Sequence, residues 1–237
     1  MRESSELPTR SDGLLDAWRE LNRPYEQNDY TGPRRGPMWE LRKGRQPFIV
    51  TAVHGVRHTR SGAMGKANDA NTAGLALLLR RAHKVAGGTV TRSDDRPDAN
   101  SDPDHPFKAA LLQALRPAPL TILVDLHGMS DDHGVDVAVG IGVAPKAPSR
   151  AAAERAAAVL EAHGLTVDFA GATTGFNGAG PGTVTTWAQA AGLAAFQLEI
   201  RQGLRSFRAP APDRQRLLRA VSAVVRDLVP HSPIRPR

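Results

Sequence analysis

Four short segments of the chain each carry a side chain that can bind a metal ion or move a proton. The segments read TAVHG, NDAN, DLHG and QLEI, and the side chains are His54, Asp69, His127 and Glu199. Each segment joins one of these side chains to an apolar, β-rich run or to the start of a helix. In an α/β protein the ends of strands hold reactive groups rigidly, while the following loops expose them. Two imidazoles and two carboxylates that converge on one pocket would make a hydrolytic zinc site.

The two histidines share one local context. Each follows an apolar run that predicts a strand, and each precedes a glycine, which lets the backbone turn close to a ligand. Asp125 lies two residues before His127, and alternate residues of a strand point to the same side. Asp125 could therefore support a metal-bound His127 from behind and hold its imidazole in one tautomer.

The remaining assignments leave alternatives. Asp69 opens a predicted helix, where its carboxylate could bind a metal ion or cap the helix. His58 or His133 could replace Asp69 as the third ligand, or could donate a hydrogen bond to the transition state. Glu199 ends an apolar strand, where an unpaired charge is costly, so either a nearby arginine neutralises it or it does chemistry.

Composition limits the kinds of site that the chain can build. The chain has 237 residues, of which 41% are hydrophobic, and this is enough for one substantial core. It contains no cysteine, so disulfide scaffolds, thiolate zinc sites and cysteine nucleophiles are excluded. Any metal ion must therefore be held by histidine, aspartate and glutamate.

The charge of the chain raises the question of nucleic-acid binding. The formal net charge is +7, with 31 basic and 24 acidic residues, and the basic residues are mostly arginines scattered along the chain. Aromatic residues make up 5% and are not interleaved with the arginines, as a base-stacking surface would need. We therefore interpret the arginine excess as codon bias and do not expect nucleic acid as a partner.

The sequence also bears on location. Its first residues, MRESSELPTRSDG, lack the apolar centre of a secretory signal, and no apolar run approaches the 18 residues of a membrane span. We therefore expect a cytoplasmic protein without a membrane span.

The elements expected to position these residues alternate between strands and helices. Strands are expected at 47–53, 89–91, 120–126, 135–143, 165–169 and 194–200, and helices at 72–84, 106–115, 149–164, 183–191 and 217–228. This alternation predicts an α/β protein, a three-layer α/β/α sandwich around a mostly parallel mixed sheet. Residues 1–45 are polar and predict an N-terminal arm or lid, in which 13–21 could form a short helix. Residues 46–230 are expected to form a single catalytic domain, followed by a tail at 231–237.

In the order of its segments the chain resembles the N-formylglutamate amidohydrolase family and, more distantly, the zinc carboxypeptidase and aspartoacylase group. The resemblance covers about residues 47–205. It rests on strand–His–Gly, an acid before a helix, an Asp/Asn loop leading to Phe-Lys, then Asp-Leu-His, a glycine-rich loop and Gln-Leu-Glu-Ile. It implies a phosphorylase/hydrolase-like α/β fold with one zinc ion (Zn2+), whose ligands would be His54, Asp69 and His127.

The resemblance also implies that Glu199 is the general base that activates the zinc-bound water. The residues themselves point to the same roles. Three protein ligands leave a fourth position for water, whose pKa zinc lowers. A carboxylate beside that water can take its proton and pass it to the leaving amine.

The substrate contacts depart from the family pattern. Members of the family have Asn-Arg after the second strand, and the arginine grips a substrate carboxylate, but here Asn100 is followed by Ser101. Arginines that could take this role are Arg57, Arg92, Arg96, Arg201 and Arg205. Arg201 is attractive because it lies two residues past Glu199, on the same face if the strand persists. Alternatively, these arginines pair with surface acids such as Asp94, Asp95 or Asp98.

The glycine-rich loop at 171–182 is expected to line the pocket, with Asn177 as a further substrate contact. We therefore expect a zinc-dependent amidohydrolase that cleaves a small, anionic, N-acyl amino acid or a peptide-like substrate. A carboxypeptidase or cell-wall amidase of the same fold is one alternative, and a non-enzymatic, basic nucleic-acid-binding module is the other. Metal analysis of the purified protein would separate the enzyme from the binding module.

Overall fold

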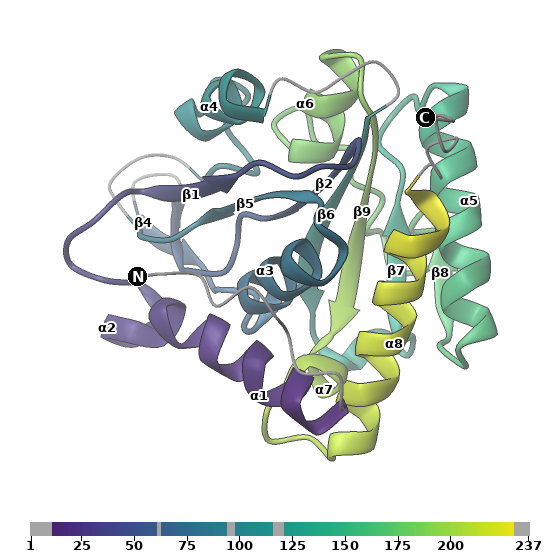
Figure 1. Ribbon diagram of the computed structural model, residues 1–237. Coiled ribbons are helices and arrows are strands. Elements are labelled where there is room, and N and C mark those ends of the chain that lie inside the picture. The colour runs from purple at the N-terminus through teal and green to yellow at the C-terminus, as the bar shows by residue number, and fades with distance from the viewer. Residues whose placement is uncertain (1–10, 61–62, 94–97, 116–120, 230–237) are drawn as a thin grey trace, which may run out of the picture.

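A mixed sheet of seven strands forms the middle layer of the computed structural model, which describes residues 11–60, 63–93, 98–115 and 121–229 (Figure 1). In spatial order the strands are β1 (Trp39–Arg42), β5 (Ala86–Val90), β2 (Phe48–Ala52), β6 (Ile122–Met129), β9 (Ala194–Arg201), β7 (Val137–Gly140) and β8 (Val167–Phe169). The four central strands, β5, β2, β6 and β9, run parallel to one another. At the edges, β1 is antiparallel to β5, and β7 is antiparallel to β9 and parallel to β8. The mostly parallel, mixed sheet that the sequence predicts is confirmed.

Helices cover both faces of this sheet, so the predicted three-layer sandwich is also confirmed (Figure 1). Helices α3 (Thr72–His83), α5 (Ala147–Ala162) and α8 (Ala211–Leu228) pack on one face, and α1 (Ser11–Asn22) packs on α3 and α8. Helices α4 (Pro106–Leu115) and α6 (Val184–Ala190) cover the other face. The short elements are η1 (Arg23–Glu26), α2 (Gln27–Tyr30), η2 (Asp131–His133), α7 (Gln202–Arg205) and the β3 (His58–Arg60)–β4 (Ala63–Lys66) hairpin.

The burial of the sheet explains its sequence pattern. All residues of β2, β5 and β7 are buried, which requires the continuous apolar or small residues that predict these strands. Helix α8 buries one stripe that includes Leu217, Val221, Val224 and Leu228, and this stripe is the helical period seen in the sequence. The core therefore lies between the sheet and its two helical layers.

The expected N-terminal arm or lid needs correction for residues 11–42. Helix α1 lies where a short helix was predicted, but Trp18 on it is fully buried and its indole nitrogen donates to the main-chain oxygen of Asn71 at 2.8 Å. Tyr25 is also buried, and β1 extends the sheet at its edge. A few large apolar residues in a polar segment are enough to dock it on α3. The domain boundaries expected at 45 and 230 stay predictions, and the tail at 231–237 lies outside the described residues.

Two further expectations differ from the structure. β5 begins before the strand expected at 89–91 and includes Gly87 and Gly88, while the last turn of α3 is followed by Lys84 in the left-handed conformation. His127 and Gly128 lie inside β6, which is longer than the apolar run suggests. No helix in the described ranges is both long and apolar enough to cross a membrane.

Candidate metal centre

The predicted metal-binding residues come together at the carboxyl ends of neighbouring central strands. His54 lies two residues after the end of β2, and His127 lies near the end of β6, which pairs with β2. Asp69 comes from the loop between β4 and α3, and its backbone N–H donates to the carbonyl of His54 at 2.7 Å. Glu199 pairs directly with His127 in the register of β6 and β9. The convergence expected from the four segments is therefore present in the fold.

Three of these residues place their ligand atoms within hydrogen-bond distance of one another. The Nδ1 atoms of His54 and His127 are 3.1 Å apart. Oδ2 of Asp69 lies 3.2 Å from Nδ1 of His54 and 3.1 Å from Nδ1 of His127. All three residues are at most 3% exposed. Tetrahedral zinc ligands at 2.0–2.1 Å from the ion would lie about 3.3 Å apart, so these atoms are spaced as such a donor set requires.

The outer nitrogen of each imidazole faces a buried carboxylate. Nε2 of His54 lies 2.7 Å from Oδ1 of Asp98, and Nε2 of His127 lies 2.7 Å from Oδ2 of Asp125. A carboxylate accepts a proton there, so both Nε2 atoms donate, and the Nδ1 atom of each neutral imidazole turns a lone pair inward. When both imidazoles are neutral, two lone pairs and a carboxylate oxygen face one another, and they repel unless a proton or a metal ion lies between them.

Other contacts hold these carboxylates in place. The Thr51 hydroxyl donates to Oδ1 of Asp125 at 2.6 Å, and the backbone N–H of Asn100 donates to Oδ1 of Asp98 at 2.8 Å. Lys66 donates to Oδ1 of Asp69 at 2.6 Å, which leaves Oδ2 to the histidines. Asp69 does not cap α3 with its side chain, because its carboxylate is engaged in this cluster.

The charges around the cluster shift the pKa values of its members. Burial alone would raise the pKa of Asp69, but hydrogen bonds from His127 and His54 hold it well below its usual range. Burial also disfavours a charged His127, yet the Asp125 and Asp69 carboxylates outweigh it and hold the pKa of His127 well above its usual range. A proton on His127 and a cation in the cluster would therefore exclude each other.

Glu199 lies beside this cluster and is not part of it. Its Oε1 accepts a hydrogen bond from Nε2 of Gln197 at 3.0 Å, and the residue is 7% exposed. Burial raises the pKa of Glu199, and the Asp69 charge raises it further, while His127, His54 and Lys66 oppose the shift. A carboxyl group with a raised pKa next to a possible cation site can accept a proton and give it back.

The four predicted substrate contacts are engaged elsewhere in this structure. Arg201 pairs with Asp136 at 2.8 Å and Arg57 pairs with Asp29 at 2.6 Å. The side-chain oxygen of Asn100 accepts from the backbone N–H of Val184, and that of Asn177 accepts from Ala179. Their roles in substrate binding stay predictions. Arg96, Asp94 and Asp95 lie outside the described residues.

The alternative ligands, His58 and His133, do not join the three inward-facing atoms. Nε2 of His58 donates to the carbonyl of Val53 at 2.7 Å, and its ring packs 5.2 Å from that of His54, on the side of Asp98. His133 is exposed and packs its ring on Phe176 at 4.8 Å. The structure therefore favours Asp69 over either histidine as the third member of the cluster.

Sequence reasoning missed three contributors to the site. Asp98, which we counted among the surface acids, is fully buried behind His54, so that interpretation is wrong. Lys66 and Gln197 orient Asp69 and Glu199. Gln197 belongs to the QLEI segment and could have been found there, because it lies two residues before Glu199 on the same face of the strand. Nothing in the sequence around Asp98 distinguishes it from its acidic neighbours.

Arg205 explains the glycine after His127. A Cβ atom on Gly128 would overlap the guanidinium group of Arg205, so any larger residue there would displace this group. The guanidinium group is buried and donates to the main-chain carbonyls of Ala70, Ile200 and Met129. Gly128 thus leaves space for the guanidinium group of Arg205 beside the cluster. It does not form a turn.

Comparisons with known proteins identify the fold of this chain but do not identify its family. No family model matches the chain, and no curated protein sequence matches it significantly. Among solved structures, the gene product Atu2144 from Agrobacterium tumefaciens superposes with a TM-score of 0.59 and 13% identity, over 81% of this chain and 94% of that chain.

Two other solved structures carry names that state a reaction. N-formylglutamate amidohydrolase from Ralstonia eutropha superposes with a TM-score of 0.54 and 15% identity, over 81% of this chain and 99% of that chain. A bacteriophage poly-gamma-glutamate hydrolase superposes with a TM-score of 0.52 and 16% identity, over 83% and 90% of the two chains. At these identities the likeness is one of fold, and the fold is the α/β architecture that such hydrolases use.

Proposed function

We propose that this protein is a zinc-dependent amidohydrolase that cleaves the amide bond of a small, anionic, N-acylated substrate. The observation that carries the proposal is the cluster of His54, Asp69 and His127. Its three inward-facing atoms lie 3.1–3.2 Å apart and are all acceptors when both imidazoles are neutral, while the outer face of each imidazole is fixed by a buried carboxylate. A metal ion relieves the repulsion among these atoms and takes the place of the proton that His127 otherwise holds there.

The donor set fits zinc. Two imidazole nitrogens and one carboxylate oxygen form a common catalytic zinc site, and both imidazoles have the carboxylate support that such sites use. When bound, zinc would lower the pKa of a water molecule and polarise the substrate carbonyl. The chain has no cysteine, so no thiolate closes the site into a purely structural one.

Glu199 supplies the proton transfer in this proposal. Its raised pKa lets it take a proton as the nucleophile forms and donate that proton to the leaving nitrogen. Gln197 holds one of its carboxylate oxygens, and Oε2 has no hydrogen bond within the described ranges. Lys66 and Arg205 contribute positive charge beside Asp69 and Glu199, which limits the pKa rise and keeps the carboxylate available as a base.

The preference for an anionic substrate rests on the arginines and on two of the structural neighbours. Arg57 and Arg201 remain the proposed substrate-binding arginines, because their side chains are 38% and 33% exposed and thus accessible despite their ion pairs. Asn100 and Asn177 remain proposed substrate contacts. The names of two neighbours refer to N-formylglutamate and to poly-gamma-glutamate, both of which carry carboxylates.

A panel of N-acyl amino acids tests the proposal. The purified chain should release free amine from N-formyl or N-acetyl acidic amino acids faster than from neutral ones. A chelator should abolish the release and added zinc should restore it. Release of a C-terminal residue from unmodified peptides would instead indicate a carboxypeptidase, and cleavage of a muramoyl-alanine amide would indicate a cell-wall amidase. No hydrolysis of any amide by the zinc-loaded chain would refute the proposal.

A further inference from the structure

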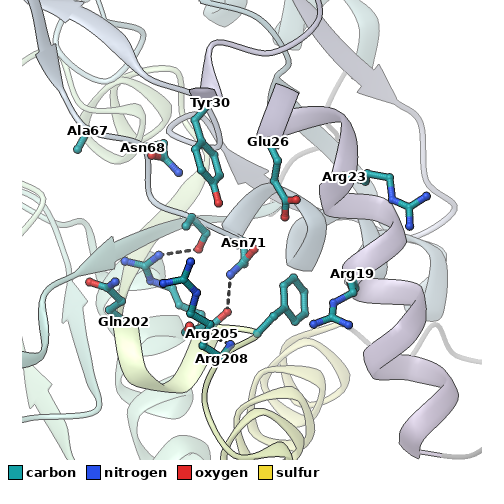
Figure 2. A pocket seen from close by; sticks show the side chains of 13 residues that line it. Arg19, Arg23, Glu26, Tyr30, Ala67, Asn68, Asn71, Gln202, Arg205 and Arg208 are labelled. Atoms are coloured by element: carbon teal, nitrogen blue, oxygen red, sulfur yellow. Dashed lines mark hydrogen bonds between the residues drawn. The ribbon is translucent and has the colours of Figure 1, made fainter. Parts of the chain in front are cut away.

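A cleft of about 720 Å³ borders the loop that carries Asp69, and Figure 2 shows the residues that line it. One of its walls is the loop that carries Asp69, since Asn68 and Ala70 on either side of this residue line the cleft. Residues of α1 and η1 form a second wall, and α7 with the segment after it forms a third. The cleft and the metal centre therefore share the Asp69 loop, although none of the four residues of the centre lines the cleft. Pockets of this size hold ligands of several hundred daltons.

The charge of the cleft is strongly positive. Its lining contains four arginines and a single acid, and these are Arg19, Arg23, Arg205, Arg208 and Glu26. Arg205 is buried at the base of the cleft, close enough for its charge to act on both Asp69 and Glu199. The other three arginines are exposed. The cleft thus carries positive charge from the metal centre outward.

Aromatic packing positions part of this positive wall. The guanidinium group of Arg19 lies 5.2 Å from the centre of the Phe207 ring, within the range of a cation–π contact. Phe207 in turn packs edge-on against the buried Trp18, with ring centroids 5.3 Å apart. Arg208 follows Phe207 directly, and its backbone N–H donates to the hydroxyl of Ser206. Arg19 and Arg208 therefore approach the cleft from two elements that are packed together.

The turn that carries Tyr30 into the cleft wall has a strained backbone. Asn28, Asp29 and Tyr30 all have positive φ angles, of 51°, 56° and 62°, although none of them is glycine. Backbone strain in this left-handed region is typically found at functional sites. The turn is held by the Arg57–Asp29 ion pair and by the backbone bond from Arg57 to Tyr30. Its result is that the Tyr30 hydroxyl points into the cleft (Figure 2).

A hydrogen-bond donor in the cleft wall lacks a partner. Nδ2 of Asn68 is buried and has no hydrogen-bond acceptor within the described part of the chain. Asn68 adjoins Asp69 in the chain and lines the cleft together with the arginines. An amide donor and a tyrosine hydroxyl next to several guanidinium groups favour an anionic, oxygen-rich ligand.

We propose that this cleft is a binding site for an acidic peptide segment, so that the substrate carries at least one carboxylate beyond the amide that is cleaved. The proposal rests on the proposed function, because it assigns the cleft to the same substrate. Arg19, Arg208 and Tyr30 bind the outer carboxylates, and Asn68 binds the main chain of the peptide. Glu26 shares the cleft and accepts a hydrogen bond from Asn22 at 3.0 Å, so its charge limits how much negative charge the cleft accepts. A carboxylate with one charge suits this balance better than a phosphate with nearly two.

Binding of tri-glutamate tests the cleft separately from hydrolysis. Calorimetry on the Glu199→Gln chain avoids consumption of the peptide. Arg19→Gln and Arg208→Gln should each weaken binding by roughly two- to fivefold, since each removes one charged contact at a solvent-exposed site. Glu26→Gln should strengthen binding by about two- to threefold, because it removes the repulsive charge. Arg150→Gln is the matched control, since Arg150 is an exposed arginine on α5 that pairs with Glu154, and it should leave binding unchanged.

The alternatives give distinct results. Equal binding of tri-alanine, or equal loss in the Arg150→Gln control, would overturn the proposal. So would a preference for inorganic phosphate or for a single-stranded oligonucleotide over tri-glutamate, because the ligand would then be a phosphate compound. If the wild-type chain cleaves N-acyl amino acids but no variant changes tri-glutamate binding, the cleft assignment alone fails. If the cleft binds tri-glutamate as expected but no amide is cleaved, the proposed function fails.

Discussion

The metal centre and the arginine-lined cleft lie next to each other, but they are built in opposite ways. The histidines and Glu199 come from the ends of neighbouring strands and Asp69 from the loop before α3, and all four are almost completely buried with polar partners. The cleft is built from α1, a strained turn and the segment around α7, and most of its charges are exposed. Rigid, desolvated groups support chemistry, in which small displacements are costly. Exposed arginines support recognition, in which each contact contributes little.

This difference predicts that substitutions in the centre have large effects and that substitutions in the cleft have small ones. The largest loss is expected for His127→Ala. It removes one inward-facing nitrogen and leaves Asp125 buried without its partner. Hydrolysis should fall to the level of a blank reaction, and added zinc should not restore it. Measured amide hydrolysis above a few per cent of wild type would break the comparison, because the centre would then be as tolerant as the cleft.

The next largest effect is expected for Glu199→Gln. The substitution keeps the shape of the side chain and the contact with Gln197 but removes the proton acceptor. The value of kcat should fall by roughly 10²–10⁴-fold while zinc content stays unchanged. Loss of zinc in this variant would make Glu199 a ligand. Normal turnover together with a lower melting temperature would make it only a charged partner in the core.

Smaller effects are expected for substitutions of the two carboxylates that contact the Nε2 atoms of the histidines. Asp98→Asn and Asp125→Asn keep the shape of each side chain but remove the charge that fixes the tautomer of the histidine in front. Each should weaken zinc affinity by about 10- to 100-fold, as measured by competition with a chelator. Asp227→Asn is the control, because Asp227 pairs with Arg155 on the surface and should leave zinc affinity unchanged. Equal affinity in all three variants would show that these carboxylates do not support a metal.

The smallest expected effect is the loss of folding stability that protonation of His58 causes at low pH. Burial, with help from the charge of His54, lowers the pKa of His58 from 6.5 to about 4. The unfolded chain therefore binds more protons than the folded one between pH 6.5 and 4, so stability is present above this range and is lost as pH falls through it. The loss assigned to His58 is about 1.4 kcal/mol between pH 8 and pH 5.5. Urea unfolding in the presence of a chelator should show this loss in wild type and a smaller one in His58→Gln, and parallel curves would contradict it.

The same contrast explains what the sequence could predict. His54, His127 and Glu199 were recognisable because each ends or follows an apolar run, and parallel strands bring such positions together. Asp98 was not, because its burial depends on how a loop folds over His54. The turn at Asn28–Tyr30 was also unpredictable, since left-handed residues are usually signalled by glycine and none is present there.

The partners of Arg201 could not be foreseen for a related reason. The residue does continue β9, a point that the strand expected at 194–200 left open, but its charge is taken by Asp136, just before β7. The pairing of β7 with β9 is a long-range contact between strands that run in opposite directions. Periodicity identifies each strand but does not specify its neighbours. Prediction therefore extended as far as individual elements and their ends, and did not extend to the loops and edges around them.

Zinc content is the most direct test of the account, because every assignment in the centre depends on a cation among His54, Asp69 and His127. The purified chain is equilibrated with zinc, dialysed and measured by elemental mass spectrometry, in parallel with the His127→Ala variant. The account predicts about one zinc ion per wild-type chain and almost none in the variant, with both proteins folded. A folded wild-type chain without zinc, or equal zinc in both proteins, would contradict it.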